Sequence, residues 1–168
     1  MNEIASILRI ALINVISPLV VEGVTIPIFD SRVNPNVTIP TLNRGKCYVI
    51  IRDQQEVQTL GCKVGYRQNA LISMDIIAKY PANVGSRVTT ELISGTIQPM
   101  IHEANFAPLL AEFGWNLMKI TKVSSRGLEE NGNTETAYRK LITYQFDVFQ
   151  EAISDVVGLQ SLLEFGLG

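Results

Sequence analysis

Hydrophobic and polar residues alternate over the segment Thr134 to Phe149, and this period of two is typical of a half-buried β-strand. One face carries Tyr138, Ile142, Tyr144, Phe146 and Val148; the other carries Arg139, Thr143, Gln145 and Asp147, with Leu141 and Phe149 as apolar exceptions. At roughly 3.3 Å per residue the strand would span about 50 Å, whereas a compact chain of this length is roughly 40 Å across. We therefore expect either an unbroken strand with one end outside the globule, or a bulge that divides it into two ordinary strands.

The rest of the chain divides into segments of helical period and segments of strand period. Asn2 to Ser17 predicts an amphipathic helix that ends at Pro18, and a second helix begins near Asn83 or Ser86 and runs toward Ile101, disturbed by Gly95 and Pro99. The segments that predict strands are Ile26–Asp30 (a short edge strand), Lys46–Val57, Arg67–Tyr80 and Trp115–Arg126.

The pair Asn131-Gly132 predicts a tight turn that joins the last of these strands to the long one. The expected fold is α+β: a mostly antiparallel sheet with two helices on one face, a long C-terminal β-hairpin and a C-terminal arm. Residues 1–150 form one module, and residues 151–168 form the arm. We expect the hairpin tip, Gly127 to Asn133, to be mobile in an isolated subunit because Leu128 is its one apolar residue.

Composition supports a folded domain, since 46% of the 168 residues are hydrophobic and 18% are charged. The net charge of −2 gives no support for sequence-specific nucleic-acid binding. Charge is uneven, however. Asp30 to Arg67 holds six basic residues against three acids, whereas the chain from Glu151 onward holds three acids and no Lys or Arg. Ordinary scatter accounts for this, or the two regions are complementary faces of a self-assembling subunit.

Candidate catalytic and metal-binding residues do not cluster in the sequence. His102 is the only histidine, so any triad must use it, and it follows a predicted helix where a surface histidine is common. Cys47 and Cys62 lack metal-ligand spacing; Cys47 is expected to be a buried thiol, with a disulfide to Cys62 left open. Glu129 and Glu130 are expected in a solvated turn. We expect no enzyme activity, no cofactor and no metal.

The apolar N-terminal segment does not predict a signal or membrane segment. It lacks a basic leading region, carries Arg9 and Asn14, and is interrupted by Pro18. We therefore expect no membrane association, and cytosolic residence follows by default.

The order of these segments resembles that of the tail terminator, or tail-completion, proteins of tailed bacteriophages. The similarity covers residues 2 to 150 and rests on the stretches "IPIFDSRVNP", "CYVIIRDQQEV", "RQNALISMDIIAKY", "VTTELISGTIQPMI" and "YRKLITYQFDVF". It implies a structural virion protein of the head–tail neck, without catalysis, in a six-fold or twelve-fold homo-oligomeric ring that contacts portal or connector proteins and tail proteins. The lumen of such a ring could pass DNA.

Alternative functions are a portal adaptor, another ring protein, a tube subunit or an assembly chaperone, and more remotely a small α+β enzyme or ligand-binding protein. Candidate interface residues under the leading hypothesis lie in the basic region, at the hairpin and in the arm: Arg32, Arg44, Arg52, Arg67, Arg126, Leu128, Glu129, Glu130, Val156, Leu159, Leu162, Leu163 and Phe165. The arm is expected to dock on the Asp30–Arg67 region of a neighbouring copy; folding back on its own sheet is the alternative.

Overall fold

The structure, a computed structural model, describes residues 4–62 and 65–151, and of residues 53–62, 65, 66 and 151 it describes the backbone alone. Its helices are α1 (Ile4–Ile16), α2 (Val88–Ile97), the short 3₁₀ helix η1 (Gln98–Met100) and α3 (Glu103–Ala111). Its strands are β1 (Leu19–Val21), β2 (Val24–Ile26), β3 (Ile28–Asp30), β4 (Thr41–Leu42), β5 (Gly45–Cys62), β6 (Gly65–Pro81), β7 (Asn116–Asn131) and β8 (Glu135–Glu151).

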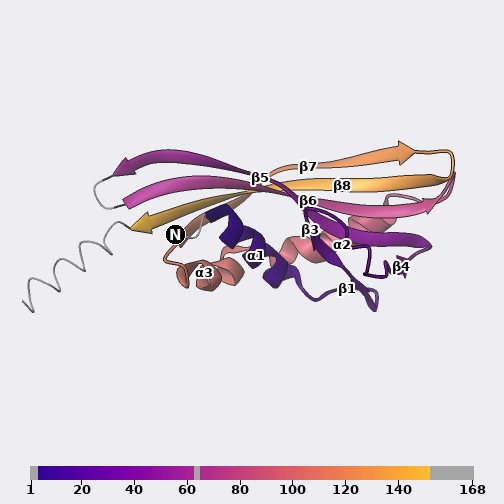
Figure 1. The fold of residues 1–168 in the computed structure, drawn as a ribbon, viewed down its shortest axis with the longest axis horizontal. Helices are drawn as coiled ribbons and strands as arrows, with labels where there is room; N and C mark the ends of the chain where they lie inside the picture. Colours follow the sequence, from indigo (N-terminus) through magenta and orange to yellow (C-terminus); the bar gives the residue numbers. More distant parts are fainter. Residues whose placement is uncertain (1–3, 63–64, 152–168) are drawn as a thin grey trace, which may run out of the picture.

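The molecule has two layers, a long sheet and a layer of helices that covers one of its faces (Figure 1). The strand order is β3-β5-β6-β8-β7, with β4 also paired to β5. Every pair in this sheet is antiparallel except β3 with β5, which is parallel. The α+β class and the mostly antiparallel sheet predicted from the sequence are confirmed.

Strand β8 is unbroken over 17 residues and pairs with β6 along its whole length without a register shift. The bulges lie in its other partner, β7, where Met118 and Val123 are the extra residues. Strands β5, β6, β7 and β8 each contain 16 to 18 residues. The fold accommodates one long strand by making its neighbours equally long, so the sheet extends beyond the helices at the end where β5 meets β6 (Figure 1).

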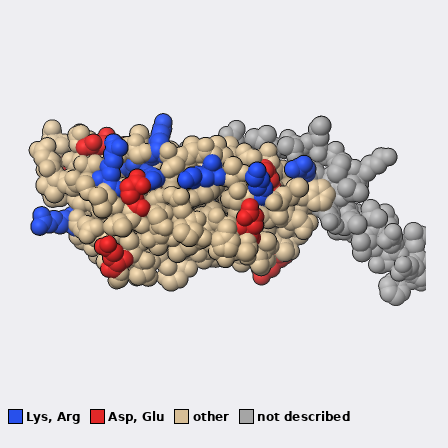
Figure 2. Space-filling model, turned by 180° about the vertical axis from the view of Figure 1, so that it is seen from behind, with Lys and Arg blue, Asp and Glu red and all other residues tan. Residues whose placement is uncertain are grey.

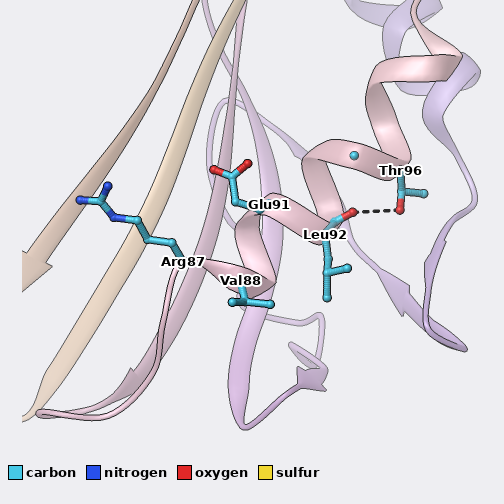
Figure 3. A pocket seen from close by; sticks show the side chains of 6 residues that line it. Arg87, Val88, Glu91, Leu92 and Thr96 are labelled. Carbon is cyan, nitrogen blue, oxygen red and sulfur yellow. Dashed lines mark hydrogen bonds between the residues drawn. The ribbon is translucent and has the colours of Figure 1, made fainter.

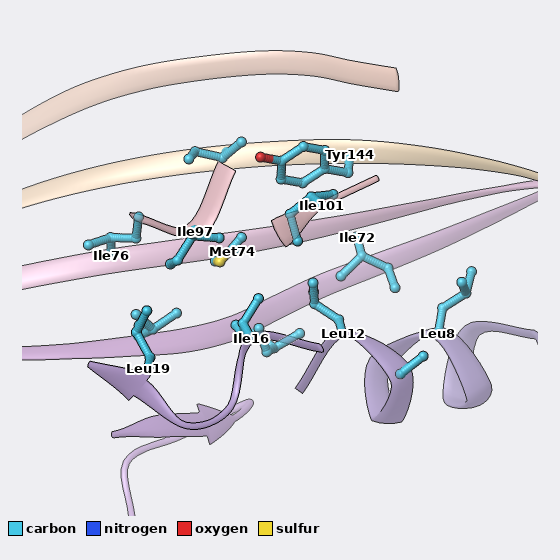
Figure 4. Close-up of a cluster of buried hydrophobic side chains, with 14 of the residues drawn as sticks. Leu8, Leu12, Ile16, Leu19, Ile72, Met74, Ile76, Ile97, Ile101 and Tyr144 are labelled. Atoms are coloured by element: carbon cyan, nitrogen blue, oxygen red, sulfur yellow. The ribbon is translucent and has the colours of Figure 1, made fainter. Parts of the chain in front are cut away.

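The main core lies between the helices and the sheet (Figure 4). Helix α1 buries Leu8, Leu12 and Ile16 at helical spacing, as its pattern predicts. Alternate residues of β6 and β8, for example Ile72 and Tyr144, line the sheet side of this core (Figure 4). The contact between the helices and the sheet buries a continuous row of large apolar side chains. It therefore supplies the main hydrophobic stabilisation of the fold.

Helix α3 was not predicted, since no helix or strand was expected between Ile101 and Trp115. Pro108 inside the helix weakens the pattern, since proline removes a backbone hydrogen bond. Tertiary packing overrides that cost. Phe106 is fully buried, and its ring lies 5.1 Å from that of Phe146 on β8, measured between centroids. The described part of the chain therefore places three α-helices on the covered face of the sheet, where two were expected.

No helix of the described chain covers the opposite side of the sheet, which we call the helix-free face (Figure 1). At its β3–β5 side the aromatic and aliphatic residues Phe29, Tyr48, Ile50 and Ile77 form a second cluster. Val33 and Ile39, from the loop after β3, pack on this cluster. The loop thus shields one part of the helix-free face. Polar side chains occupy the centre of that face.

Candidate interaction surfaces

A chain of ion pairs crosses the helix-free face over four strands. Asp75 on β6 is completely buried, and its carboxylate accepts hydrogen bonds from Arg139 on β8 (2.5 Å from Nη2 to Oδ2) and Arg52 on β5 (3.3 Å from Nε). Arg139 also binds Glu130 on β7, with 2.5 Å between Nη1 and Oε1. The hydrogen bonds that Arg139 donates to Asp75 are the main cause of a raised pKa for the Arg139 guanidinium.

This network is set by strand register. Asp75 faces Ile50 on one side and Leu141 on the other, so it points to the helix-free face like them. A buried carboxylate costs several kcal/mol unless it is paired and hydrogen-bonded. Asp75 therefore requires the two arginines, and the arginines in turn link the four long strands side by side.

The outer edge of β7 is unpaired, since β8 is its one partner strand among the described residues. The Ile120 amide donates to Oε1 of Glu103 on α3 at 3.2 Å, which shows that it points away from β8. By the two-residue period of the ladder, the amides opposite Ile142, Lys140 and Tyr138 point outward too; these belong to Ser125, Gly127 and Glu129. Within residues 4–62 and 65–151, these three amides thus have no strand partner on their outer side.

Basic side chains accompany this edge. Lys119, Lys122 and Arg126 of β7 are all exposed, and Figure 2 shows Lys and Arg in a row along the length of the molecule. Edge strands with lysines and bulges resist unspecific pairing, and β7 has both.

Strand β5 provides a second open edge. On its outer side β3 pairs with Val49, Ile50 and Ile51, and β4 pairs with Gly45 and Lys46. Beyond Ile51 the described strands leave β5 paired to β6 alone. The two open edges lie on opposite sides of the sheet, and the strands at them, β5 and β7, run in opposite directions.

A basic hollow of about 340 Å³ lies where β4 turns into β5. Its charged residues are Arg44, Lys46, Lys79 and Glu135. Lys46 and Lys79 are directly opposite in the β5–β6 ladder, which costs free energy because like charges meet. Glu135 offsets part of this cost, with its Oε1 3.8 Å from the Lys79 Nζ.

A larger hollow, about 530 Å³, lies on the exposed side of α2 (Figure 3). It is lined by Arg87, Val88, Glu91, Leu92, Gly95 and Thr96. Val88 and Leu92 extend to the same side of the helix, away from the Glu91 carboxylate (Figure 3). Val88 is 59% exposed and Leu92 is half-buried, while Ile93 and Ile97 form the core face of this helix.

The structure brings some of the sequence-predicted interface residues together. Arg52 and Glu130 share the ion-pair network, and Arg126 and Leu128 lie beside it on β7, opposite Leu141 and Arg139. Glu129 occupies the other face of β7, opposite Tyr138. The remaining residues are spread out: Arg44 lines the basic hollow, and Arg32 and Arg67 are exposed elsewhere. The arm residues Val156, Leu159, Leu162, Leu163 and Phe165 lie outside the described residues.

The candidate catalytic groups lie apart from these surfaces. His102 is exposed at the N-cap of α3, as expected, and its side chain makes no capping hydrogen bond. Cys47 is free and buried, so the disulfide to Cys62 is not formed. Burial raises the pKa of the Cys47 thiol to about 11. Within the described residues no three His, Cys, Asp or Glu side chains group as metal ligands.

Asp75 and the α2 hollow were not predicted from the sequence. An acid among the aliphatic residues of "ISMDIIAKY" is a signal for a paired buried charge. Gly95 within a helical pattern costs about 1 kcal/mol relative to alanine, and this unfavourable position is the sequence signal at the hollow. Among the described residues, no helix has the length and apolar character required to cross a bilayer. No protein-family model matches the chain, and no curated protein matches its sequence.

Proposed function

We propose that this chain is a structural subunit of a bacteriophage head–tail neck, which assembles into a closed ring that terminates the tail or joins it to the portal or connector. Its place is then the virion, after synthesis in the host cytoplasm, and its neighbours are portal or connector proteins and tail proteins. The observation that carries the proposal is a sheet of four equally long strands with open edges on both sides. The family resemblance of residues 2 to 150 supports the location in the neck.

The open edges suit head-to-tail assembly. Strands β5, β6, β8 and β7 alternate in direction, so the β7 edge of one copy would run antiparallel to the β5 edge of an identically oriented copy. Because β3 and β4 cover β5 from Gly45 to Ile51, level with Ser125–Asn131, the two copies would be offset along the strands. Two different surfaces then meet at every contact, which is the heterologous arrangement that a closed ring requires. Main-chain hydrogen bonds across such an edge provide affinity.

Other features fit a subunit that must stay soluble before it assembles. The lysines and bulges of β7 oppose pairing with arbitrary strands, and Glu103 already occupies the Ile120 amide. The region left for a partner strand is therefore Ser125 to Asn131. The buried network through Asp75 holds the long strands in register up to that region.

The test is the size of the purified full chain, by light scattering and negative-stain electron microscopy, for the natural chain and a Ser125→Pro variant. Proline at Ser125 removes an outward amide while leaving the ladder to β8 intact. We expect discrete rings for the natural chain and for Ser125→Ala, and folded monomers for Ser125→Pro. A natural chain that stays monomeric at high concentration would exclude self-assembly.

The same micrographs separate this role from other virion roles. A tail terminator or adaptor stops at a ring of defined size, whereas a tube subunit stacks into long hollow tubes. A monomer that binds a small ligand would instead support the ligand-binding alternative.

A further inference from the structure

The hollow on α2 exposes apolar surface that the described chain does not use. Val88 has the largest exposed fraction among the exposed large hydrophobic residues of the described chain. Thr96 donates its hydroxyl to the Leu92 carbonyl at 3.0 Å, so it adds no unpaired donor to the wall (Figure 3). Arg87 and Glu91 place charges at the rim. An apolar floor with a charged rim is typical of a protein contact site.

Gly95 adds an independent observation. A glycine within an exposed helix costs about 1 kcal/mol relative to alanine. A Cβ at Gly95 would have no atom within 4 Å, so the packing of the described chain does not explain the glycine. Because Gly95 has no side chain, the hollow stays open beside Leu92 and Thr96, which leaves room for a segment from outside to pack closely.

The arm, residues 152–168, has the chemistry to fill this hollow. Val156, Leu159 and Leu163 recur at helical spacing, and the arm carries the acids Asp155 and Glu164 without any Lys or Arg. Arg87 at the rim offers a complementary charge. By contrast, the Asp30–Arg67 region has one exposed large hydrophobic residue among those whose side chains are described, Val37, at 39%. The apolar arm residues therefore match the α2 hollow better than the basic region.

The arm of the same chain starts too far away to dock there as a helix. Glu91, at the rim, accepts a hydrogen bond from Lys140 Nζ at 2.6 Å, which places the hollow near Lys140 of β8. From Lys140 the unbroken strand runs to Glu151, a distance of about 36 Å. As a helix, residues 152–168 would span about 25 Å. A fully extended arm would be long enough to reach the hollow of its own chain. In that conformation, however, Val156, Leu159 and Leu163 would not share one face.

We propose that the C-terminal arm of one copy docks as an amphipathic helix in the α2 hollow of a neighbouring copy. This rests on the proposed assembly of copies. It identifies the hollow as the arm's binding site and makes the exchange of arms a contact separate from the sheet edges. Burial of three or four apolar side chains would contribute substantially to the contact.

Disulfide trapping between differently tagged full-length chains tests the proposal. In a Cys62→Ser background, one chain carries Val88→Cys and the other carries Leu163→Cys, and the two are co-assembled and oxidised. We expect a cross-linked species with both tags. Ile10→Cys in place of Val88→Cys is the matched control, because Ile10 is 56% exposed on α1 and lies outside the hollow; it should give no cross-link.

Two substitutions provide a readout that does not depend on cysteines. The binding partner is the chain truncated after residue 153, and the ligand is a synthetic peptide of residues 152–168. Val88→Asp in the truncated chain should lower its affinity for the peptide by about tenfold. Ile10→Asp should leave the affinity unchanged. The truncated chain must first melt cooperatively. If it does not, the same two variants are compared in the full-length chain by the concentration at which assemblies dissociate, with the same tenfold shift expected for Val88→Asp alone.

The failures are distinguishable. Rings that form without the Val88–Leu163 cross-link would overturn arm exchange and leave the proposed ring intact. A cross-link within a single chain carrying both cysteines, at high dilution, would show that the arm folds back on its own chain. Absence of any assembly would overturn both proposals.

Discussion

Asp75 and Arg139 form a salt bridge with 2.5 Å between Oδ2 and Nη2, and the Asp75 side chain has no exposed surface although no helix of the described chain covers its face of the sheet. The arginine side chain is 25% exposed, so the two partners are desolvated unequally. Removing either partner therefore has different consequences, because only Asp75 is left without access to water.

Arg139→Met should destabilise the protein by about 3 kcal/mol, since it leaves the Asp75 carboxylate buried with Arg52 as its remaining partner. Asp75→Leu should cost less, because both arginines can turn to solvent. The double variant should recover much of the loss, which chemical denaturation would measure. Lys79→Met, which removes the exposed pair with Glu135, is the control and should change stability by under about 1 kcal/mol.

Tyr144→Phe should stabilise the protein by about 1 kcal/mol. The Tyr144 hydroxyl is buried and has no hydrogen-bond partner among the described residues, so its removal eliminates a desolvation cost. Tyr80→Phe is the matched opposite case, because the Tyr80 hydroxyl donates to Thr89 Oγ1 at 2.6 Å, and its loss should destabilise by about 1 kcal/mol. Thermal melts of both variants check the prediction; equal shifts would contradict it.

Stability should fall between pH 9 and 11 in part because of Cys47. Burial raises the pKa of this thiol from 9.0 to about 11. In that window the unfolded chain loses the proton while the folded chain keeps it, so rising pH favours unfolding, by a contribution on the order of 2 kcal/mol. Cys47→Ala should lower stability at pH 8 but flatten its decline above pH 9. An unchanged slope would show that Cys47 does not contribute.

His102→Asp should stabilise the protein by about 1 kcal/mol and leave assembly intact. His102 has extended N-cap geometry at α3 without a capping hydrogen bond, and aspartate at this position can accept one from the helix amides. His102→Ala should be nearly neutral. Loss of function in a folded His102 variant would instead indicate the enzymatic role that the non-enzyme interpretation rejects.

Hydrogen exchange near the β7–β8 turn should alternate along the chain in the isolated subunit. The outward amides of Gly127 and Glu129 should exchange quickly, and the inward amides of Leu128 and Glu130 more slowly, because they bond β8. In the assembled protein the outward amides should become protected. Uniform fast exchange from Gly127 to Asn133 would match the simpler expectation of a wholly mobile tip; strong protection of the outward amides in a dilute monomer would contradict edge pairing.

The sequence was sufficient for the elements whose periodicity is strong. The alternation from Tyr138 to Val148 identifies the covered face of β8, and the spacing from Ile7 to Ile16 identifies α1. The order of apolar and polar residues along the chain predicts these elements, because each of them buries one face. The same local signal fails at α3, where Pro108 obscures a helix that the contact of Phe106 with Phe146 stabilises.

Tertiary structure alone decided how these elements combine into surfaces. The sequence shows an isolated Asp75, but only the register of β5, β6 and β8 places Arg52 and Arg139 within reach of it. Likewise, the apolar residues of α2 lie on both sides of the helix, and only the packing of α2 on the sheet decides that Ile93 and Ile97 are buried while Val88 is exposed. Periodicity reports which residues share a face of one element. Which faces become buried depends on contacts between residues far apart in the chain, and these form when the sheet and helices come together.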